Sequence, residues 1–376
     1  MSTNPEARAW IQVRADALRS NYRRVRASVG PDARIIPMVK ADAYGLGVRE
    51  SVRALEAEAP WGYGVATVEE GLEVQALGTG RPVAVFSPIP PGSVVSALEA
   101  GLHVNVGSLH TLGQVTDWSE ESGGAPRIHV EVDTGMGRSG FDWRTAAEWM
   151  PRIAEAVGRG VEWVGYYTHL HSADCALDTV REQWTRFRLS LDVPGAPDEK
   201  ALRHVLNSAG ALRAPEYAGQ AVRPGIFLYG GRVGDGACAP DTVVSLHARV
   251  VHVRDAAPGT TLGYGATYAA RDPERWATLS IGYGDGLPRA LGNRGSALLG
   301  GTRVPIIGRT SMDVTVVDIT GVPGIRPGDV ATLMGTDGQE EITVDDVASL
   351  AGTISYEVLT GLTRRLPRVW TGETGS

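Results

Sequence analysis

The sequence is poor in the features that mark several large classes of protein. It has only two cysteines, Cys175 and Cys238, without paired spacing, so neither a disulfide framework nor a zinc ribbon is expected. Its 36 basic residues are outnumbered by 43 acidic ones, which gives a formal net charge of −7. A general nucleic-acid binder would present a basic face, so we expect no nucleic-acid partner.

Long apolar runs are also missing. No run approaches the roughly 20 apolar residues that span a membrane. The first ten residues, MSTNPEARAW, lack the apolar core of a secretory signal. The sequence therefore favours a soluble cytoplasmic protein without a membrane partner.

What is present is a regular alternation of short apolar runs and helix-like segments over residues 10–240. Strands that alternate with helices are typical of βαβ units and a parallel sheet. Eight runs within about 210 residues predict a (β/α)8 barrel. The alternative is a doubly wound open sheet, but the glycine-rich first turn of that fold is absent. The runs are 34–40, 61–68, 81–87, 102–106, 127–133, 163–170, 203–208 and 220–225.

The pattern changes near residue 240. Strand-like runs separated by Gly, Pro and Asp follow, and helix signals return only at 344–351 and near 356–362. This predicts a second, mainly antiparallel β domain over residues 241–376, which residues 1–9 are expected to join. Its runs are 245–254, 276–283, 296–308, 313–319, 328–335 and 340–345.

Polar residues stand at the expected C-terminal ends of the barrel strands, where the chemistry of such barrels lies. Lys40 ends the first apolar run, although lysine is rarely buried without a partner. Alone, Lys40 would most simply be a solvated turn residue, but a whole rim of polar residues argues for a site. The other ends carry Arg138, His169, Asn207, Ser208 and Arg223.

The loops after the seventh and eighth runs, NSAGAL and RPGIFLYG, suit an anion. The corresponding loops of such barrels often bind phosphate. Here Ser208 offers a hydroxyl, and Gly225 and Ile226 offer backbone N–H groups. A lysine beside a phosphate site is what a cofactor held through a Schiff base requires. Its amine must be neutral to attack a carbonyl, and an apolar strand end with arginines nearby favours that form.

At this point the sequence resembles a known family. VKADAYGLG (39–47) is similar to the pyridoxal-phosphate attachment motif of the alanine racemases. The resemblance continues in the order of the family through nearly the whole chain. The further matching segments are DTGMGRSGF (133–141), YYTHLHSAD (166–174), LNSAGAL (206–212), VRPGIFLYG (222–230), LGYGATY (262–268), SIGYGDGLPR (280–289), GRTSMDV (308–314), ISYEVL (354–359) and TRRLPR (363–368).

The resemblance implies a fold, an activity and an assembly. It implies a (β/α)8 barrel followed by a β domain, with pyridoxal 5′-phosphate as the cofactor. The activity would be the interconversion of L- and D-alanine, supplying D-alanine for cell-wall peptidoglycan. The assembly would be a head-to-tail homodimer in which the β domain completes the active site of the partner.

The resemblance also assigns roles to residues. Lys40 and Tyr264 of the partner subunit would be the two bases on opposite faces of the substrate, with a His169–Arg223 network as the cations near the phenol. Arg223 would face the pyridine nitrogen, and His169 would pack beside the ring. The partner's Met312 and the partner's Asp313 would line the pocket, and Arg138 would bind the substrate carboxylate. The residues expected at the phosphate are Tyr44, Asn207, Ser208, Gly225, Ile226 and Tyr356.

One position departs from the family. Many members carry a carbamylated lysine where this chain has Glu131. Strand alternation in 127–133 puts Glu131 on the same face as His129 and Asp133, which we expect to point into the barrel. Glu131 could act as a built-in anion that orients Arg138, or it could form a simple interior ion pair, and both interpretations stay open here.

Other interpretations have weaker support. His169 and His171 form an H-x-H pair that could bind a metal, but no third ligand occurs at a useful spacing, so no metal is expected. Asp133-Thr134-Gly135 resembles an aspartic-protease signature, but the second such motif is missing. The alternative activities are a serine or broad-specificity racemase, a fold-related decarboxylase, and a non-catalytic cofactor carrier. The carrier would lack the β domain, and the decarboxylase would have no use for Tyr264.

Overall fold

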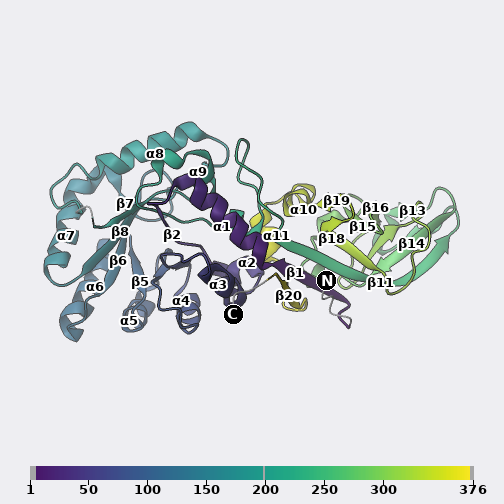
Figure 1. The fold of residues 1–376 in the computed structure, drawn as a ribbon, viewed down its shortest axis with the longest axis horizontal. Coiled ribbons are helices and arrows are strands. Elements are labelled where there is room, and N and C mark those ends of the chain that lie inside the picture. The colour runs from purple at the N-terminus through teal and green to yellow at the C-terminus, as the bar shows by residue number, and fades with distance from the viewer. Residues whose placement is uncertain (1–5, 198–199, 373–376) are drawn as a thin grey trace.

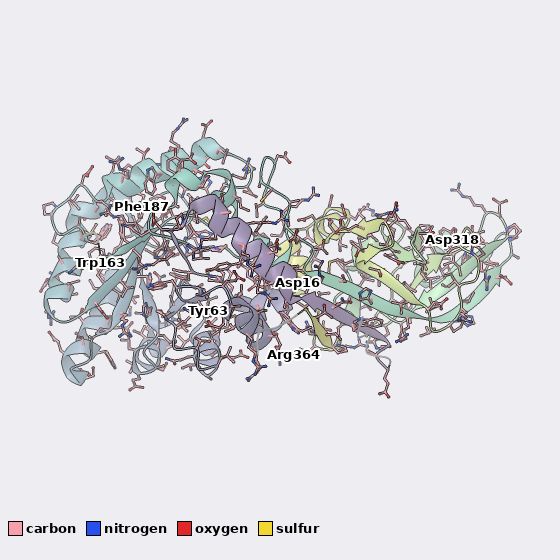
Figure 2. All side chains as sticks on the ribbon, in the orientation of Figure 1. Asp16, Tyr63, Trp163, Phe187, Asp318 and Arg364 are labelled. Atoms are coloured by element: carbon pink, nitrogen blue, oxygen red, sulfur yellow. The ribbon has the colours of Figure 1, made fainter. Side chains whose placement is uncertain are left out.

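The computed structural model describes residues 6–197 and 200–372. It forms an elongated molecule with a barrel of strands and helices at one end and a β unit at the other (Figure 1). Figure 2 shows Tyr63, Trp163 and Phe187 in the barrel unit and Asp318 in the β unit. One continuous apolar core runs through both units.

The first unit is the predicted (β/α)8 barrel. Its parallel strands follow the order β2-β10-β9-β8-β6-β5-β4-β3. The ring closes where Met38 bridges Gly64 in parallel and the Val39 N–H donates to the Gly64 carbonyl at 2.8 Å. Each strand coincides with or overlaps one predicted run. The strands are β2 (Arg34–Ile35), β3 (Tyr63–Val65), β4 (Val83–Val85), β5 (His103–Val106), β6 (Arg127–Asp133), β8 (Glu162–Tyr167), β9 (Leu202–His204) and β10 (Ala221–Val222).

Helices cover the outside of this ring (Figure 1). Local sequence starts several of them: Thr67 and Glu70 form a capping box at α4, and the Ser108 hydroxyl accepts the Thr111 N–H at α6. The helices of this unit are α1 (Ala15–Val29), α2 (Lys40–Gly45), α3 (Val48–Glu56), α4 (Val68–Gln75), α5 (Pro91–Glu99), α6 (Leu109–Ser122), α7 (Ala146–Gly158), α8 (Leu177–Leu189) and α9 (Ser208–Arg213), with short helices η1 (Trp143–Thr145), η2 (Pro215–Tyr217) and η3 (Ile226–Tyr229) and the added strand β7 (Phe141–Asp142).

The second unit is mainly antiparallel, as predicted. Its longest strand, β11 (Val244–Ala256), pairs with β14 and β18, and the path β11-β18-β15-β16-β17-β14 returns to β11, so these strands form a closed ring. The other elements are β12 (Thr261–Leu262), η4 (Tyr264–Ala266), β13 (Tyr268–Ala269), β14 (Glu274–Leu279), η5 (Tyr283–Asp285), η6 (Arg289–Leu291), β15 (Ser296–Leu299), β16 (Thr302–Ile307), β17 (Thr315–Asp318), β18 (Val330–Asp337), β19 (Glu340–Ile342), α10 (Val344–Ala351), α11 (Ser355–Thr360) and β20 (Arg368–Thr371).

The N-terminal strand belongs to the second sheet. β1 (Ala9–Arg14) pairs antiparallel with β11 and parallel with β20. The chain therefore enters the barrel unit only at α1, slightly later than residue 10. Residues 1–5 of the segment expected in the β domain lie outside the described residues. In the described parts of the chain, no helix is long and apolar enough to cross a membrane.

Candidate active site

A cavity of about 160 Å³ opens at the C-terminal ends of the barrel strands. All eleven residues that the sequence predicts for the barrel side of the site line it, including Tyr356 from α11. The lining residues are Met38, Lys40, Tyr44, Val65, Phe86, Ser87, Glu131, Arg138, Tyr167, His169, Asn207, Ser208, Arg223, Gly225, Ile226 and Tyr356.

Lys40 begins a turn of unusual handedness. The next four residues, Ala41 to Tyr44, all have φ between 51° and 57°. A left-handed turn costs about 1–2 kcal/mol per L-residue, so neighbours must hold it. Glu70 accepts the Ala41 N–H at 2.7 Å, and the Arg368 guanidinium donates to the Gly45 carbonyl at 2.8 Å. No local pattern predicts this turn, because two distant residues fix it.

The surroundings of Lys40 favour a neutral amine. Burial lowers the pKa of the Lys40 amine, and the positive charges of Arg138 and Arg223 lower it further, while Glu70 acts in the opposite direction. A neutral amine at the mouth of the barrel can act as a nucleophile or as a base.

Hydroxyl and backbone N–H groups gather at the other side of the cavity. The Ser208 hydroxyl accepts the Gly225 N–H at 2.7 Å, and the Asn207 side chain caps α9 by accepting the Gly210 N–H at 3.0 Å. A Cβ atom on Gly225 would lie 2.1 Å from the Tyr44 hydroxyl, so only glycine leaves room for that phenol. These donors suit a phosphate group.

Two tyrosines of this corner are neutral donors. Tyr44 stacks on Tyr229 with ring centroids 4.6 Å apart, and Tyr356 lies 6.0 Å from Tyr44. Burial raises the pKa of Tyr44 well above its ordinary value and that of Tyr356 to about 12. Both phenols therefore keep the proton that they would donate to an anion.

Arg223 is a buried cation, 4% exposed. Its Nη1 donates to His204 Nδ1 and to the His204 carbonyl, both at 2.6 Å, and its Nη2 donates to the Thr168 carbonyl at 2.8 Å. Burial lowers its pKa to about 10, so it remains charged at neutral pH. The sequence suggested His169 as its neighbour in the network, but the imidazole that hydrogen-bonds to Arg223 belongs to His204, which sequence reasoning missed.

His169 lines the cavity as a neutral imidazole. Burial lowers its pKa to about 3, and the charges of Arg223, Arg138 and Lys40 act in the same direction. Gln183 donates to the His169 carbonyl at 3.0 Å and fixes the backbone there. A neutral, held imidazole can pack beside a flat ring without adding charge to it.

Glu131 and Arg138 line the same cavity but form no ion pair within the described residues. The two carboxylate oxygens of Glu131 accept hydrogen bonds from Asn105 Nδ2 and from the Ser139 hydroxyl, both at 3.0 Å. Glu131 is buried, whereas Arg138 is exposed. The Glu131 carboxylate thus accepts from Ser139, the residue next to Arg138, and does not bind the Arg138 guanidinium.

Three predicted site residues lie on the β unit and do not line this cavity. Tyr264, in η4 between β12 and β13, is 71% exposed, and Met312 is 53% exposed. Figure 1 places β13 at the end of the β unit remote from the barrel. Asp313 accepts from Arg365 Nη2 at 2.7 Å. Within one chain the structure therefore does not bring these residues to Lys40.

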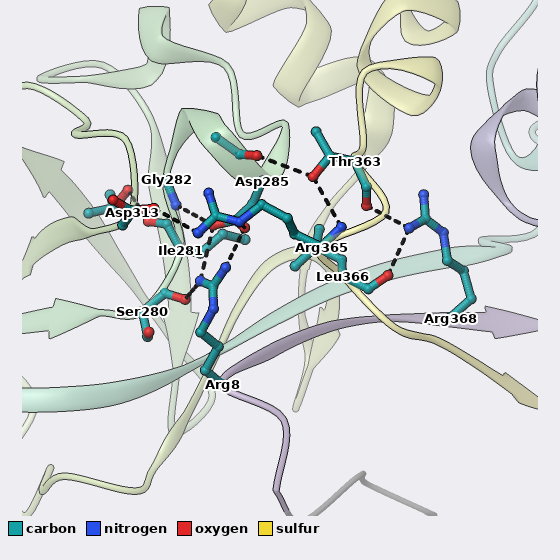
Figure 3. Close-up of polar contacts among 12 residues, drawn as sticks. Arg8, Ser280, Ile281, Gly282, Asp285, Asp313, Thr363, Arg365, Leu366 and Arg368 are labelled. Atoms are coloured by element: carbon teal, nitrogen blue, oxygen red, sulfur yellow. Dashed lines mark hydrogen bonds and ion pairs between the residues drawn. The ribbon is translucent and has the colours of Figure 1, made fainter.

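A network of ion pairs fixes the loop that carries Met312 and Asp313. The fully buried carboxylate of Asp285 lies between Arg8, which donates at 3.1 Å, and Arg365, whose Nε lies 3.3 Å from it (Figure 3). Arg365 connects this buried carboxylate to Asp313. In the sequence Arg365 stands only within the matching segment TRRLPR, and nothing there placed it beside the site residues.

The fold and the cavity define a two-domain barrel protein with a lysine at the barrel mouth. Beside it lies a group of hydroxyl and N–H donors from Tyr44, Ser208, Gly225 and Tyr356, called here the anion corner. The family model "Alanine racemase, N-terminal domain" matches residues 13–233, and "Alanine racemase, C-terminal domain" matches residues 243–370. The chain belongs to the alanine racemase family.

Individual relatives agree over nearly the whole chain. The alanine racemase of Symbiobacterium thermophilum is 37% identical over 375 residues, covering 97% of both chains, and that of Halothermothrix orenii is 32% identical over 380 residues, again covering 97% of both. The crystal structure of alanine racemase from D-cycloserine-producing Streptomyces lavendulae has a TM-score of 0.90 at 30% identity and 98% coverage of both chains. The enzyme of Bartonella henselae, with covalently bound pyridoxal phosphate, has a TM-score of 0.89 at 27% identity, covering 97% of this chain and all of that one.

Proposed function

We propose that this chain is a pyridoxal-phosphate-dependent enzyme that interconverts L- and D-alanine by proton transfer at two faces of Cα. The observation that carries the proposal is the single cavity in which Lys40, the anion corner and Arg223 meet. The proposal includes the cytoplasmic location that the sequence composition favours and the supply of D-alanine for peptidoglycan that the family resemblance implies.

The residues of the cavity fit the cofactor. Lys40 would hold its aldehyde carbon, and Arg223 would donate to its ring nitrogen. When bound, pyridoxal phosphate supplies an electron-withdrawing ring that acidifies the Cα proton of an amino acid. The groups that would hold its phosphate are the hydroxyls of Tyr44, Ser208 and Tyr356, the Asn207 side chain, and the N–H groups of Gly225 and Ile226.

Lys40 is the base on one face. Burial and the charges of Arg138 and Arg223 lower the pKa of its amine, which favours the form with a free lone pair that can take a proton from Cα. The strained turn behind it fixes the direction of the side chain, because Glu70 and Arg368 hold that backbone in place. A positioned base is more effective than a mobile one, since less conformational freedom is lost on reaction.

Tyr264 of the partner subunit is the base on the other face. A phenol is a weak base at neutral pH and needs cations nearby. Arg309 is close to its turn, because a Cβ atom on Gly265 would lie 3.0 Å from Arg309 Nη1. In the cavity that this tyrosine would enter, the cation would be Arg223.

The assembly would be a homodimer with shared sites. Tyr264 and Met312 are exposed on the β unit, while Ile354 and Tyr356, 61% and 42% exposed, lie near the mouth of the barrel. Two separate groups of exposed apolar residues on one chain suit a two-fold interface. In such an interface the residues of the β unit would cover the barrel mouth of the partner, and those of the partner would cover the barrel mouth of this chain. The partner's Met312 and the partner's Asp313 would then line the cavity.

Arg138 would bind the substrate carboxylate. Glu131 would act through Ser139, which it holds next to Arg138. We expect Glu131→Gln to raise the KM for alanine, because the uncharged amide anchors Ser139 less firmly. Unchanged KM and kcat in this variant would leave Glu131 as a structural residue only.

The first experiment is the loss of optical rotation from L-alanine beside L-serine, with the visible absorbance of bound cofactor recorded on the same sample. Faster reaction of alanine than of serine, with a band lost on borohydride reduction, would support the proposal. A band without racemisation would refute it in favour of the decarboxylase or carrier.

We expect Lys40→Ala to abolish both signals and Tyr264→Phe to impair racemisation with the cofactor retained. Tyr217→Phe, at a tyrosine that does not line the cavity, is the control.

Mixing two inactive variants tests whether the sites are shared. In a mixed dimer of Lys40→Ala and Tyr264→Phe subunits, one site combines Lys40 of the second chain with Tyr264 of the first, and the other site lacks both. Random exchange should therefore restore about a quarter of the wild-type activity. No restoration would show that each site lies within one chain.

A further inference from the structure

Three buried histidines form a line of hydrogen bonds that ends on Arg223. His204 Nδ1 lies 2.6 Å from Arg223 Nη1, His204 Nε2 lies 3.0 Å from His129 Nδ1, and His129 Nε2 lies 3.2 Å from His103 Nδ1. They come from β9, β6 and β5, and at most 4% of each is exposed. The line runs from the active site into the barrel interior, and the proposed reaction does not use it.

The cation at one end orders the protons along the whole line. Arginine has only donors, so His204 Nδ1 must accept from it and His204 must carry its proton on Nε2. That proton is donated to His129 Nδ1, so His129 carries its own proton on Nε2 and donates it to His103 Nδ1. Every imidazole is then in the same tautomer, because any other order places two N–H groups against each other.

The barrel leaves space for this arrangement at Gly165. A Cβ atom at this position in β8 would lie 2.0 Å from His129 Nδ1 and 2.7 Å from His204 Nε2. Any side chain here would therefore separate the two imidazoles at their hydrogen bond. The three rings are also kept neutral: burial lowers the pKa of His103 to about 4 and those of His129 and His204 well below their ordinary values.

The line of histidines lies where the buried cation of Arg223 requires stabilisation. Arg223 forms no ion pair within the described parts of the chain, and a buried cation without a counter-ion is costly. Glu131 is nearby, but its oxygens are bound by Asn105 and Ser139. The rings of Tyr167 and Phe86 lie 4.8 Å and 5.6 Å from the guanidinium carbon. Burial lowers the pKa of Arg223, and the charge of Glu131 raises it without contact. The groups that accept the hydrogen bonds of Arg223 are neutral dipoles: the carbonyls of His204 and Thr168 and the His204 imidazole.

We propose that His103, His129 and His204 are positioning residues that stabilise Arg223 as a cation without neutralising it. Their dipoles align head to tail, with the acceptor nitrogen of each ring directed toward the guanidinium, and such chains polarise one another. A carboxylate in their place would cancel the charge. The line of imidazoles lets the full positive charge act on whatever faces Arg223, which by the proposed function is the ring nitrogen of the cofactor.

The direct test is the tautomeric state of the histidines in the full chain, without and with pyridoxal phosphate. Long-range ¹H–¹⁵N correlation spectra of ¹⁵N-histidine protein distinguish the two neutral tautomers and the charged ring. We expect His103, His129 and His204 to be neutral with the proton on Nε2 at pH 7 in both samples. A proton on Nδ1, or a charged ring, at any of the three would overturn the proposal. Because the cofactor-free sample suffices, this result does not depend on the proposed function.

Two substitutions at one position test the link to Arg223. In His204→Asn the amide oxygen can replace Nδ1 as the acceptor for Arg223, whereas His204→Gln places its amide near Nε2 and leaves the guanidinium without that acceptor. We expect the Gln variant to lose roughly tenfold more kcat than the Asn variant, with a displaced cofactor absorbance band and little change in KM. Equal losses, or a larger loss in His204→Asn, would contradict the proposal.

Gly165→Ala tests the line without changing any titratable group. Its methyl group should break the His129–His204 bond. Arg223 then still holds the His204 proton on Nε2, but His129 and His103 are no longer ordered and should show both tautomers, and kcat should fall. Gly113→Ala, in α6 with open space around it, is the control and should change neither. A single Nε2–H tautomer at His129 with unchanged kcat in Gly165→Ala would overturn the proposal. If Gly165→Ala does not fold, the His204 pair still decides the matter.

Discussion

Because the turn after Lys40 is left-handed, replacing alanine by glycine should change the free energy of unfolding in opposite directions at Ala41 and at Ala27. Ala41 is exposed and has φ of 51°, whereas Ala27 is exposed in the right-handed α1. Replacing Ala41 by glycine relieves about 1–2 kcal/mol of left-handed strain and costs roughly 0.5–1 kcal/mol through the greater freedom of the unfolded chain. We therefore expect Ala41→Gly to raise the free energy of unfolding by about 0.5–1 kcal/mol. Ala27→Gly should lower it by about as much.

The assay is urea unfolding of the cofactor-free chain, followed by tryptophan fluorescence, with both variants measured beside the wild type. The two midpoints should move in opposite directions. Racemisation by Ala41→Gly should fall a few-fold although the protein is more stable, because the freed turn positions Lys40 less firmly. A loss of stability in Ala41→Gly similar to that in Ala27→Gly would refute the strain argument, since exposure and chemistry are matched and only handedness differs.

Three further predictions concern the site and its supports. Gly225→Ala should weaken cofactor binding about 10–100-fold in an absorbance titration, because its methyl group would lie 2.1 Å from the Tyr44 hydroxyl. Below pH 6.5 the unfolded chain protonates His103, whereas the buried ring in the folded chain stays neutral until about pH 4, so this residue alone should lower the free energy of unfolding by about 3 kcal/mol over this range. The other buried histidines, whose pKa values are also lowered, add to the fall, and His103→Asn should remove only the His103 part of the pH dependence in urea titrations. Arg365→Ala should lower kcat by releasing the Asp313 loop, while Arg8 still pairs with the buried Asp285 carboxylate; unchanged kcat would contradict this.

The fold was largely predictable because its signals are local. Apolar runs and the helical segments between them predicted the barrel and the β domain, because each strand and each helix must bury one face. The strand at Ala9–Arg14 was harder to assign, because its partners β11 and β20 lie at the far end of the chain. The closure of the second ring between β11 and β18 depends in the same way on residues that are distant in sequence.

The candidate site was predictable in residue type but not in geometry. Polar residues at strand ends predicted Lys40, Arg138, His169, Asn207, Ser208 and Arg223 at the cavity. Tyr44, Tyr356 and Glu131 were expected there only through the family resemblance. The handedness of the turn after Lys40 was not visible, because Glu70 and Arg368 impose it. His204 lies inside a predicted strand, and its inward-facing imidazole was the only signal that could have identified it as the partner of Arg223. Glu131 does not pair with Arg138, because Ser139 and Asn105 occupy its oxygens.

The charges of the cavity connect these observations. Lys40, Arg138 and Arg223 line it against the single carboxylate of Glu131, and within the described residues neither arginine forms an ion pair. Buried cations without carboxylate partners destabilise the folded chain when no ligand is bound, and they favour the binding of anions. A phosphate and a substrate carboxylate together would supply the charge that the cavity lacks. Burial lowers the pKa of the Lys40 amine and the two arginines lower it further, so the groups that attract the ligands also favour the neutral form of the proposed base.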